Sequence, residues 1–291
     1  MLKQAFRHLF LTVVLASGAM VASTWVTAHE FSAGLDNAEW HLEPSPLDCK
    51  LWQEIPHYGL AVFEMGAGEK LSFYLESDRP VFEKSEAELM ITAPFWRPGV
   101  NTYSVGKVES FTGKRPVSLG NKLANKMVDE LVAGLVPKIY FQNPSHPIQV
   151  AVSAVNFQEA YNGLVSCLAG LFPENYDQLS NSFLLFGTNK YGLQDSAKQR
   201  LDMIAGYLNI DPEVSHIYVY GHTDTIGRRG HNWELSRLRA KEVKDYLVKK
   251  GVDPEMITTN YYGETRPRFK EKNRNDRSKN RRVYVRLKKS S

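Results

Sequence analysis

The sequence predicts an α+β protein with two domains: a β-rich N-terminal domain with a few helices, followed by a β-α-β-α-β domain. The 291 residues are enough for two separate hydrophobic cores. Hydrophobic residues make up 43% of the chain and charged residues 23%, which is typical of globular proteins and excludes a disordered chain. The hydrophobic pattern also changes near residue 173, from mostly strand-like segments to strands that alternate with helices.

The N-terminus, residues 1–28, is typical of a signal peptide. Lys3 and Arg7 give it a positive start, residues 9–22 are apolar, and residues 26–28 form a cleavage site of small residues. An uncleaved membrane anchor is the alternative, because the apolar segment with the cleavage site is nearly long enough to span a bilayer. Small and hydroxyl side chains interrupt this segment, so we expect cleavage and export.

The chain has two cysteines, Cys49 and Cys167. In an exported protein they favour a disulfide, and two buried free thiols are the alternative. A disulfide that closes a loop of this length would stabilise the fold by up to ~4–5 kcal/mol in the chain-entropy description.

Residues 29–172 form the predicted N-terminal domain. Apolar and β-branched runs predict strands at residues 60–63, 70–75, 88–92 and 148–153. Gly66 and Gly68 lie between the first two runs and predict a hairpin turn. Apolar residues at helical spacing predict helices at residues 121–136 and 158–171.

Residues 173–291 form the predicted C-terminal domain, and residues 173–177 are its entry or a linker. Strands are predicted at residues 183–186, 216–220, 257–262 and 282–287, and helices at residues 193–208 and 232–250. Asn232 is a favourable N-cap for the second helix, and Gly251 ends it.

Arg239 occupies an unusual position on the second helix, on the apolar stripe between Leu235 and Val243. A lone Arg there most often extends its charged group to solvent, and the alternative is an anionic partner. Asp224, at the end of the preceding strand, is a candidate partner. A carboxylate and a guanidinium a few ångströms apart can pair, or they can bind a zwitterion between them.

A set of motifs around these two residues is specific. The chain contains Gly221-His-Thr-Asp224, Gly227, Asn232, Leu235-Ser236, Arg239-Ala240 and Asn280-Arg-Arg-Val283 in that order. With this spacing, residues 175–291 resemble the OmpA-like peptidoglycan-binding domain. The resemblance implies that the domain binds meso-diaminopimelate in the peptide stem of peptidoglycan. Asp224 would take the ligand's ammonium and Arg239 its carboxylate, and further residues would line or brace the pocket: Thr223, Asn232, Leu235 and Arg282. The loop at residues 226–231 departs from the family pattern because it is longer or more basic.

The first half carries weaker motifs, which include Trp40, Ser45, residues 55–63, Gly68 and residues 71–75. In order and length they resemble the N-terminal domain of the MotY family, periplasmic proteins of sodium-driven flagellar motors. The resemblance implies a disulfide between the two cysteines and a place in the T ring beneath the outer-membrane basal body. It also implies three partners, namely the flagellar basal body, MotX and the PomA–PomB stator, whose units the protein would help to position for motility.

The remaining motifs do not indicate catalysis. No spacing of His and Cys residues predicts a metal site, no nucleophile motif occurs, and His222 is interpreted as a structural residue. Asp211 and Glu213 are interpreted as surface acids. We therefore expect no enzyme, no catalytic residues, no metal and no cofactor. A wall-modifying enzyme ranks last among three hypotheses, behind a motor anchor and a general tether between the outer membrane and peptidoglycan.

The C-terminal segment is basic, since residues 264–291 contain 12 Lys or Arg and 3 Asp or Glu. Such a segment can bind nucleic acid or an anionic surface, or it can be one face of a folded domain. Export and the alternating pattern of the last strand favour the folded face and argue against nucleic acid. Arg281 or Arg282 is expected to brace the binding site.

Overall fold

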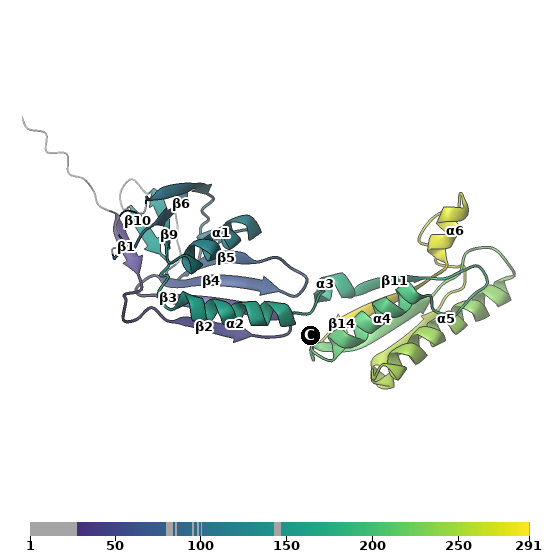
Figure 1. The fold of residues 1–291 in the computed structure, drawn as a ribbon. Coiled ribbons are helices and arrows are strands. Elements are labelled where there is room, and N and C mark those ends of the chain that lie inside the picture. The colour runs from purple at the N-terminus through teal and green to yellow at the C-terminus, as the bar shows by residue number, and fades with distance from the viewer. Residues whose placement is uncertain are drawn as a thin grey trace, which may run out of the picture.

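The computed structural model describes residues 28–290, except 80–83, 85, 95, 98, 100 and 143–146. The predicted signal peptide lies almost entirely outside these described residues. Among them, no helix combines the length and the apolar character needed to cross a membrane. Two domains, each with its own hydrophobic core, follow one another along the chain, and helix α3 lies between them (Figure 1).

The described part of the N-terminal domain contains two five-stranded sheets and two helices. The first sheet has the order β1 (His29–Ser32), β10 (Ile148–Ala151), β9 (Val136–Gln142), β6 (Glu86–Thr92) and β7 (Tyr103–Val108). The second has the order β2 (Trp40–Pro44), β3 (Asp48–Ile55), β4 (Gly59–Gly66), β5 (Ser72–Ser77) and β8 (Val117–Leu119). All neighbours are antiparallel except β1 and β10. The helices are α1 (Asn121–Val132) and α2 (Phe157–Gly170).

This domain confirms the predicted hairpin, the helices and the β-rich character. Alternating side chains of β3, β4 and β5 are fully buried, and Phe63, Phe73 and Phe157 form the centre of the core. Cys49 of β3 and Cys167 of α2 form a disulfide, with their Cα atoms 6.0 Å apart. The cross-link therefore fastens the last helix of the domain to an interior strand of its sheet.

The C-terminal domain has one four-stranded sheet with the order β11 (Asn181–Leu185), β14 (Arg282–Lys289), β12 (Val214–Gly221) and β13 (Ile257–Tyr261). The longer helices are α4 (Asp195–Leu208) and α5 (Arg229–Lys249), and the short ones are α3 (Tyr176–Leu179), η1 (Pro254–Met256) and α6 (Arg274–Asn280). The predicted β-α-β-α-β order is confirmed, and the three short helices were not predicted. Apolar residues of α4 and α5 pack against the sheet, so one sheet face forms the core.

Two predictions about individual residues of this domain are wrong. Helix α5 begins at Arg229, so Asn232 lies inside the helix and is not its N-cap. Its side-chain amide instead donates a hydrogen bond to the carbonyl oxygen of Asp224, at 3.4 Å. Asp211 is buried and is not a surface acid, because its carboxylate accepts hydrogen bonds from Tyr207 at 2.7 Å and pairs with Lys289 at 3.0 Å.

The two domains contact each other at the tips of the β2–β3 and β4–β5 hairpins. The amide of Phe172 donates to the carbonyl oxygen of Pro46 at 2.8 Å, and Leu47 packs against the core of the C-terminal domain. At Gly68, which has φ +66°, a Cβ atom would lie 2.2 Å from the side-chain oxygen of Gln178. The segment predicted as an entry or linker is therefore held against the first domain.

Candidate functional site

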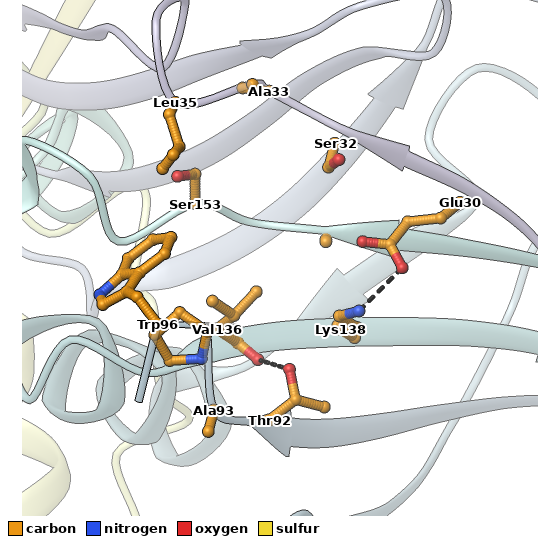
Figure 2. Close-up of a pocket in the computed structure, with 13 residues that line it drawn as sticks. Glu30, Ser32, Ala33, Leu35, Thr92, Ala93, Trp96, Val136, Lys138 and Ser153 are labelled. Atoms are coloured by element: carbon orange, nitrogen blue, oxygen red, sulfur yellow. Dashed lines mark hydrogen bonds and ion pairs between the residues drawn. The ribbon is translucent and has the colours of Figure 1, made fainter. Parts of the chain in front are cut away.

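The N-terminal domain has a cavity of about 390 Å³ beside β1, β9 and the end of β6. Glu30 and Lys138 form an ion pair at 2.8 Å on one side of it, and Trp96 lies on the other side with Leu35 nearby (Figure 2). Leu35 and Trp96 are 51% and 47% exposed. This cavity matches no sequence-predicted site, and its exposed apolar side chains are typical of a surface that contacts another protein.

The C-terminal domain has a smaller cavity of about 180 Å³ at the carboxyl end of β12. It brings together four of the predicted site residues, namely Asp224, Asn232, Leu235 and Arg239. The other lining residues come from the β11–α4 loop, the loop before α5, the first turn of α5 and the residue before β14: Thr188, Asn189, Ile226, Gly227, His231 and Arg281. The cavity lies below the roughly 300–1,000 Å³ of sites for drug-sized ligands, so it suits one end of an amino acid.

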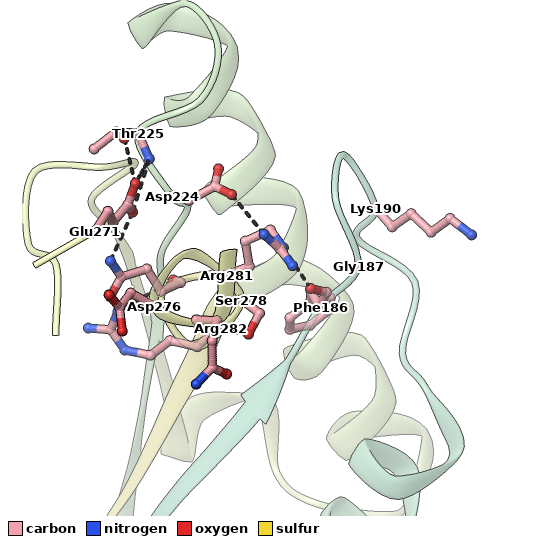
Figure 3. A network of polar contacts seen from close by, with 12 residues as sticks. Phe186, Gly187, Lys190, Asp224, Thr225, Glu271, Asp276, Ser278, Arg281 and Arg282 are labelled. Atoms are coloured by element: carbon pink, nitrogen blue, oxygen red, sulfur yellow. Dashed lines mark hydrogen bonds and ion pairs between the residues drawn. The ribbon is translucent and has the colours of Figure 1, made fainter. Parts of the chain in front are cut away.

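Asp224 is paired with Arg281. The Oδ2 atom of Asp224 accepts a hydrogen bond from Nη1 of Arg281 at 2.9 Å, and the two side chains are 8% and 12% exposed (Figure 3). Nε of Arg281 also donates to the carbonyl oxygen of Phe186 at 3.2 Å. The sequence left open whether Arg281 or Arg282 braces the binding site, and Arg281 is the one that lines the cavity.

Arg239 is completely buried and is held by backbone carbonyl groups. Its Nε donates to Lys190 O at 2.9 Å, its Nη1 to His222 O at 2.8 Å and its Nη2 to Gly187 O at 3.1 Å. Neither extension to solvent nor a direct pair with a carboxylate is therefore observed. A guanidinium has five N–H groups, so these three bonds leave two for a ligand.

The charge of Arg239 persists in this environment. Burial lowers the pKa of Arg239 to about 10. The Asp224 carboxylate acts to raise this pKa, and the positive charge of Arg281 acts to lower it. The group is thus cationic at neutral pH. The cavity walls carry two guanidinium groups and one carboxylate, an arrangement that can bind a ligand with one ammonium and more than one carboxylate.

Close packing of α5 on β12 positions these groups. At Gly221 a Cβ atom would lie 2.1 Å from the carbonyl oxygen of Ser236, so only a glycine allows this approach. The contact places Arg239 beside the end of β12, where His222 supplies one of its carbonyl partners.

Thr223 and Arg282 are not among the residues that line the cavity. Thr223 is buried, its amide donates to Gly263 O at 2.9 Å, and its hydroxyl has no hydrogen-bond partner among the described residues. Arg282 donates to the carbonyl oxygens of Asn280 at 3.4 Å and Arg266 at 3.2 Å. Arg282 therefore braces the loop before β14 and does not line the cavity.

His222 is a neutral structural residue. Burial lowers the pKa of His222 to about 3, and the charges of Arg282 and Arg266 act in the same direction. His222 therefore carries no charge near neutral pH. Among the described residues, no group of three or more His, Cys, Asp or Glu side chains could hold a metal ion.

A polar network beside the cavity was not predicted. The carboxylate of Glu271 accepts hydrogen bonds from the amide of Thr225 at 3.2 Å and from Nδ2 of Asn280 at 2.9 Å (Figure 3). Asn280 belongs to a recognised motif, whereas Glu271 has no sequence signal. The network connects the loop after Asp224 to the start of β14 and so fixes the position of the Asp224 carboxylate.

Comparison with known proteins covers both domains. The family model of the MotY N-terminal domain matches residues 31–173, and that of the OmpA family matches residues 185–281. The sodium-type flagellar protein MotY of Vibrio parahaemolyticus is 28% identical over 285 residues, which cover 94% of this chain and 97% of that protein. The peptidoglycan-associated lipoprotein of Haemophilus influenzae is 35% identical over 162 residues, 55% of this chain and 98% of that protein. The solved C-terminal domain of Helicobacter pylori MotB is 25% identical, with a TM-score of 0.36, over 38% of this chain and 86% of its own. The chain therefore consists of a MotY N-terminal domain followed by a domain of the OmpA family.

Proposed function

We propose that this chain is a non-enzymatic periplasmic anchor of a sodium-driven flagellar motor, which binds peptidoglycan through the cavity at Asp224 and Arg239. One observation carries this proposal: a buried carboxylate and a buried guanidinium line one small cavity, and each is held by other groups. Because neither charge neutralises the other by a direct bond, a zwitterion can bind between them.

The chemistry of the cavity fits the free end of meso-diaminopimelate. The ligand's ammonium would bind the Asp224 carboxylate, and its carboxylate would bind the two remaining N–H groups of Arg239. Arg281 would add a second cationic contact. Asn232 and Leu235 would shape the wall of the cavity, and Thr223 and Arg282 would support it from outside.

The motor role rests on the N-terminal domain. The Vibrio parahaemolyticus protein that matches 94% of this chain is named as a sodium-type flagellar protein. In the proposed arrangement this domain binds the flagellar basal body near the outer membrane as part of the T ring, and MotX and the PomA–PomB stator are its partners. The cavity flanked by Leu35 and Trp96 is the candidate contact surface.

A general tether between the outer membrane and peptidoglycan is the second candidate. It is favoured by the similarity to a peptidoglycan-associated lipoprotein over almost all of that protein's length. Deletion of the gene distinguishes the two functions. Loss of swimming with an intact envelope supports the motor anchor, whereas leakage of periplasmic proteins with normal swimming supports the tether.

The wall-binding site is tested by pelleting the mature protein with isolated sacculi. We expect Asp224→Asn to lower the bound fraction by at least about tenfold, because a charged hydrogen bond is worth ~1.5–3 kcal/mol. Asp245→Asn, on the exposed side of α5, is the matched control and should bind like the wild type. Free meso-diaminopimelate should release the wild-type protein. Wild-type binding by Asp224→Asn would overturn the site.

A further inference from the structure

The sheet of the C-terminal domain has a second face, opposite α4 and α5. Side chains alternate along β11, so Leu184 is buried in the core while Phe183 and Leu185 are 40% and 46% exposed on this second face. The strand register places Tyr284 beside Phe183 and Tyr220 beside Tyr284. The face is therefore crossed by aromatic residues from three neighbouring strands.

These residues form one continuous group, the aromatic row, which consists of Phe183, Tyr218, Tyr220, Tyr262 and Tyr284. The rings of Phe183 and Tyr284 are stacked with centroids 4.9 Å apart, and those of Tyr284 and Tyr220 are 5.6 Å apart. Tyr220 also stacks with Tyr218 at 6.1 Å and Tyr262 at 6.2 Å. The cavity at Asp224 does not involve any of these rings.

Guanidinium groups cover the two ends of the aromatic row. Arg268 lies 3.8 Å from the ring centroid of Phe183, and Arg266 lies 3.9 Å from that of Tyr262. The flat faces of Phe183, Tyr284 and Tyr262 are thus occupied by other rings or by arginine side chains. What remains for a partner is ring edges, tyrosine hydroxyls and the N–H groups of the guanidinium ions.

The face carries uncompensated positive charge. Arg266, Arg268, Arg286 and Lys288 are exposed, and none of the four forms an ion pair within the described part of the chain. Strands β11, β12, β13 and β14 contain no Asp or Glu. Unpaired cations beside half-buried Tyr side chains are the composition that is enriched in protein–protein interfaces.

We propose that this second sheet face binds an acidic surface of another protein. A second copy of the same face is disfavoured because like charges would meet. A sugar chain is disfavoured because sugars stack on free ring faces, and most of these are covered. Carboxylates match the guanidinium groups, and backbone and amide groups of a protein match the hydroxyls and the Asn181 and Asn260 side chains of the face.

The charge requirement is tested with the mature protein and fluorescent poly-L-glutamate as the acidic polypeptide probe. We expect the double variant Arg268→Glu/Arg286→Glu to weaken binding by about tenfold or more, with a steep salt dependence in the wild type. The control Lys122→Glu/Lys249→Glu changes net charge equally at exposed lysines on α1 and α5 and should bind within about twofold of wild type. An equal loss in both would show that only net charge matters and would overturn the proposal. The variant Arg268→Gln/Arg286→Gln is a second test in case the charge reversal prevents folding. Circular dichroism checks the fold of each variant.

The class of partner is tested in cells by a photo-crosslinking amino acid at Tyr220, with Val248 of α5 as the control position. The expected product joins Tyr220 to an acidic segment of a second protein, identified by mass spectrometry, and disappears in the Arg268→Glu/Arg286→Glu background. Crosslinks only to this chain, or only to lipid or glycan, would overturn the proposal. Pelleting with sacculi should be unchanged in this variant, which separates this face from the wall-binding site.

Discussion

The two domains of this protein bury polar groups in different ways. In the N-terminal domain the buried polar residues are scattered: Gln53, Ser77, Thr92, Ser110 and Glu130. In the C-terminal domain most of them gather at one end of the sheet: His222, Thr223, Asp224, Asn232, Ser236, Arg239, Asn280 and Arg282. The first domain depends on an apolar core and a disulfide for its stability, whereas the second concentrates costly buried charge where a ligand can use it.

The largest expected effect concerns the disulfide. Cys49→Ser should lower the free energy of unfolding of the N-terminal domain by about 4–5 kcal/mol, because the bond spans a long loop. The two cysteines are 118 residues apart in sequence. Urea denaturation of the mature protein with and without reductant measures this. Reduction should destabilise the wild type and leave the variant unchanged, and an equal response of both would contradict the assignment.

Arg239 provides the corresponding test for the C-terminal domain. Arg239→Ala should lower its free energy of unfolding by roughly 3–5 kcal/mol, because three buried carbonyl groups lose their charged donor. Differential scanning calorimetry should show a shift in the transition of this domain only. A shift in the transition of the N-terminal domain instead would show that Arg239 does not stabilise the C-terminal domain separately. Arg239→Lys is the control for charge, since it keeps the cation but not the three hydrogen bonds.

Asp211 is the one buried acid of the C-terminal domain, among the described residues, that does not line the cavity. Burial raises the pKa of Asp211, but hydrogen bonds from Tyr207, Lys289 and the Glu213 amide outweigh it and hold the pKa below the usual value. The stabilisation is therefore present above the unfolded pKa of about 3.9 and is lost as pH falls through the folded pKa. Asp211→Asn should cost about 1.5–3 kcal/mol at pH 7. Its deficit should shrink as pH falls below about 4, and a deficit that is independent of pH would refute this.

The smallest expected effect concerns the contact between the domains. Gly68→Ala should cost about 1–2 kcal/mol through its left-handed backbone and should also push the hairpin tip away from Gln178. Gly113→Ala is the control, since Gly113 also has positive φ and open space around it. Limited proteolysis after Phe172 should be faster in Gly68→Ala only. Equal rates in the two variants would show that this contact does not restrain the domains.

The helices and strands of this structure could be predicted where local hydrophobic periodicity indicates them. The apolar stripe correctly placed Arg239 on the inner face of α5, but the two expected outcomes, extension to solvent or a carboxylate partner, are not observed. The carbonyl groups that hold it could not be foreseen, since Gly187, Lys190 and His222 belong to loops and a strand end. Asp211 was misjudged for the same reason, because its partner Lys289 lies far along the chain. Patterns of 2 and 3.6 residues report which face is buried, but not which distant groups meet there.

The position of the disulfide has a mechanical consequence. In the proposed role the chain would bridge the wall and the basal body and would be under tension, and this tension would enter the N-terminal domain at Phe172. Without the bond, a pull could peel α2 away from the domain turn by turn. Cys167 passes the load to Cys49 in β3, a strand that is hydrogen-bonded to β2 on one side and β4 on the other. The force then shears two rows of hydrogen bonds at once, so the domain can bear a load along its length that its helix alone could not.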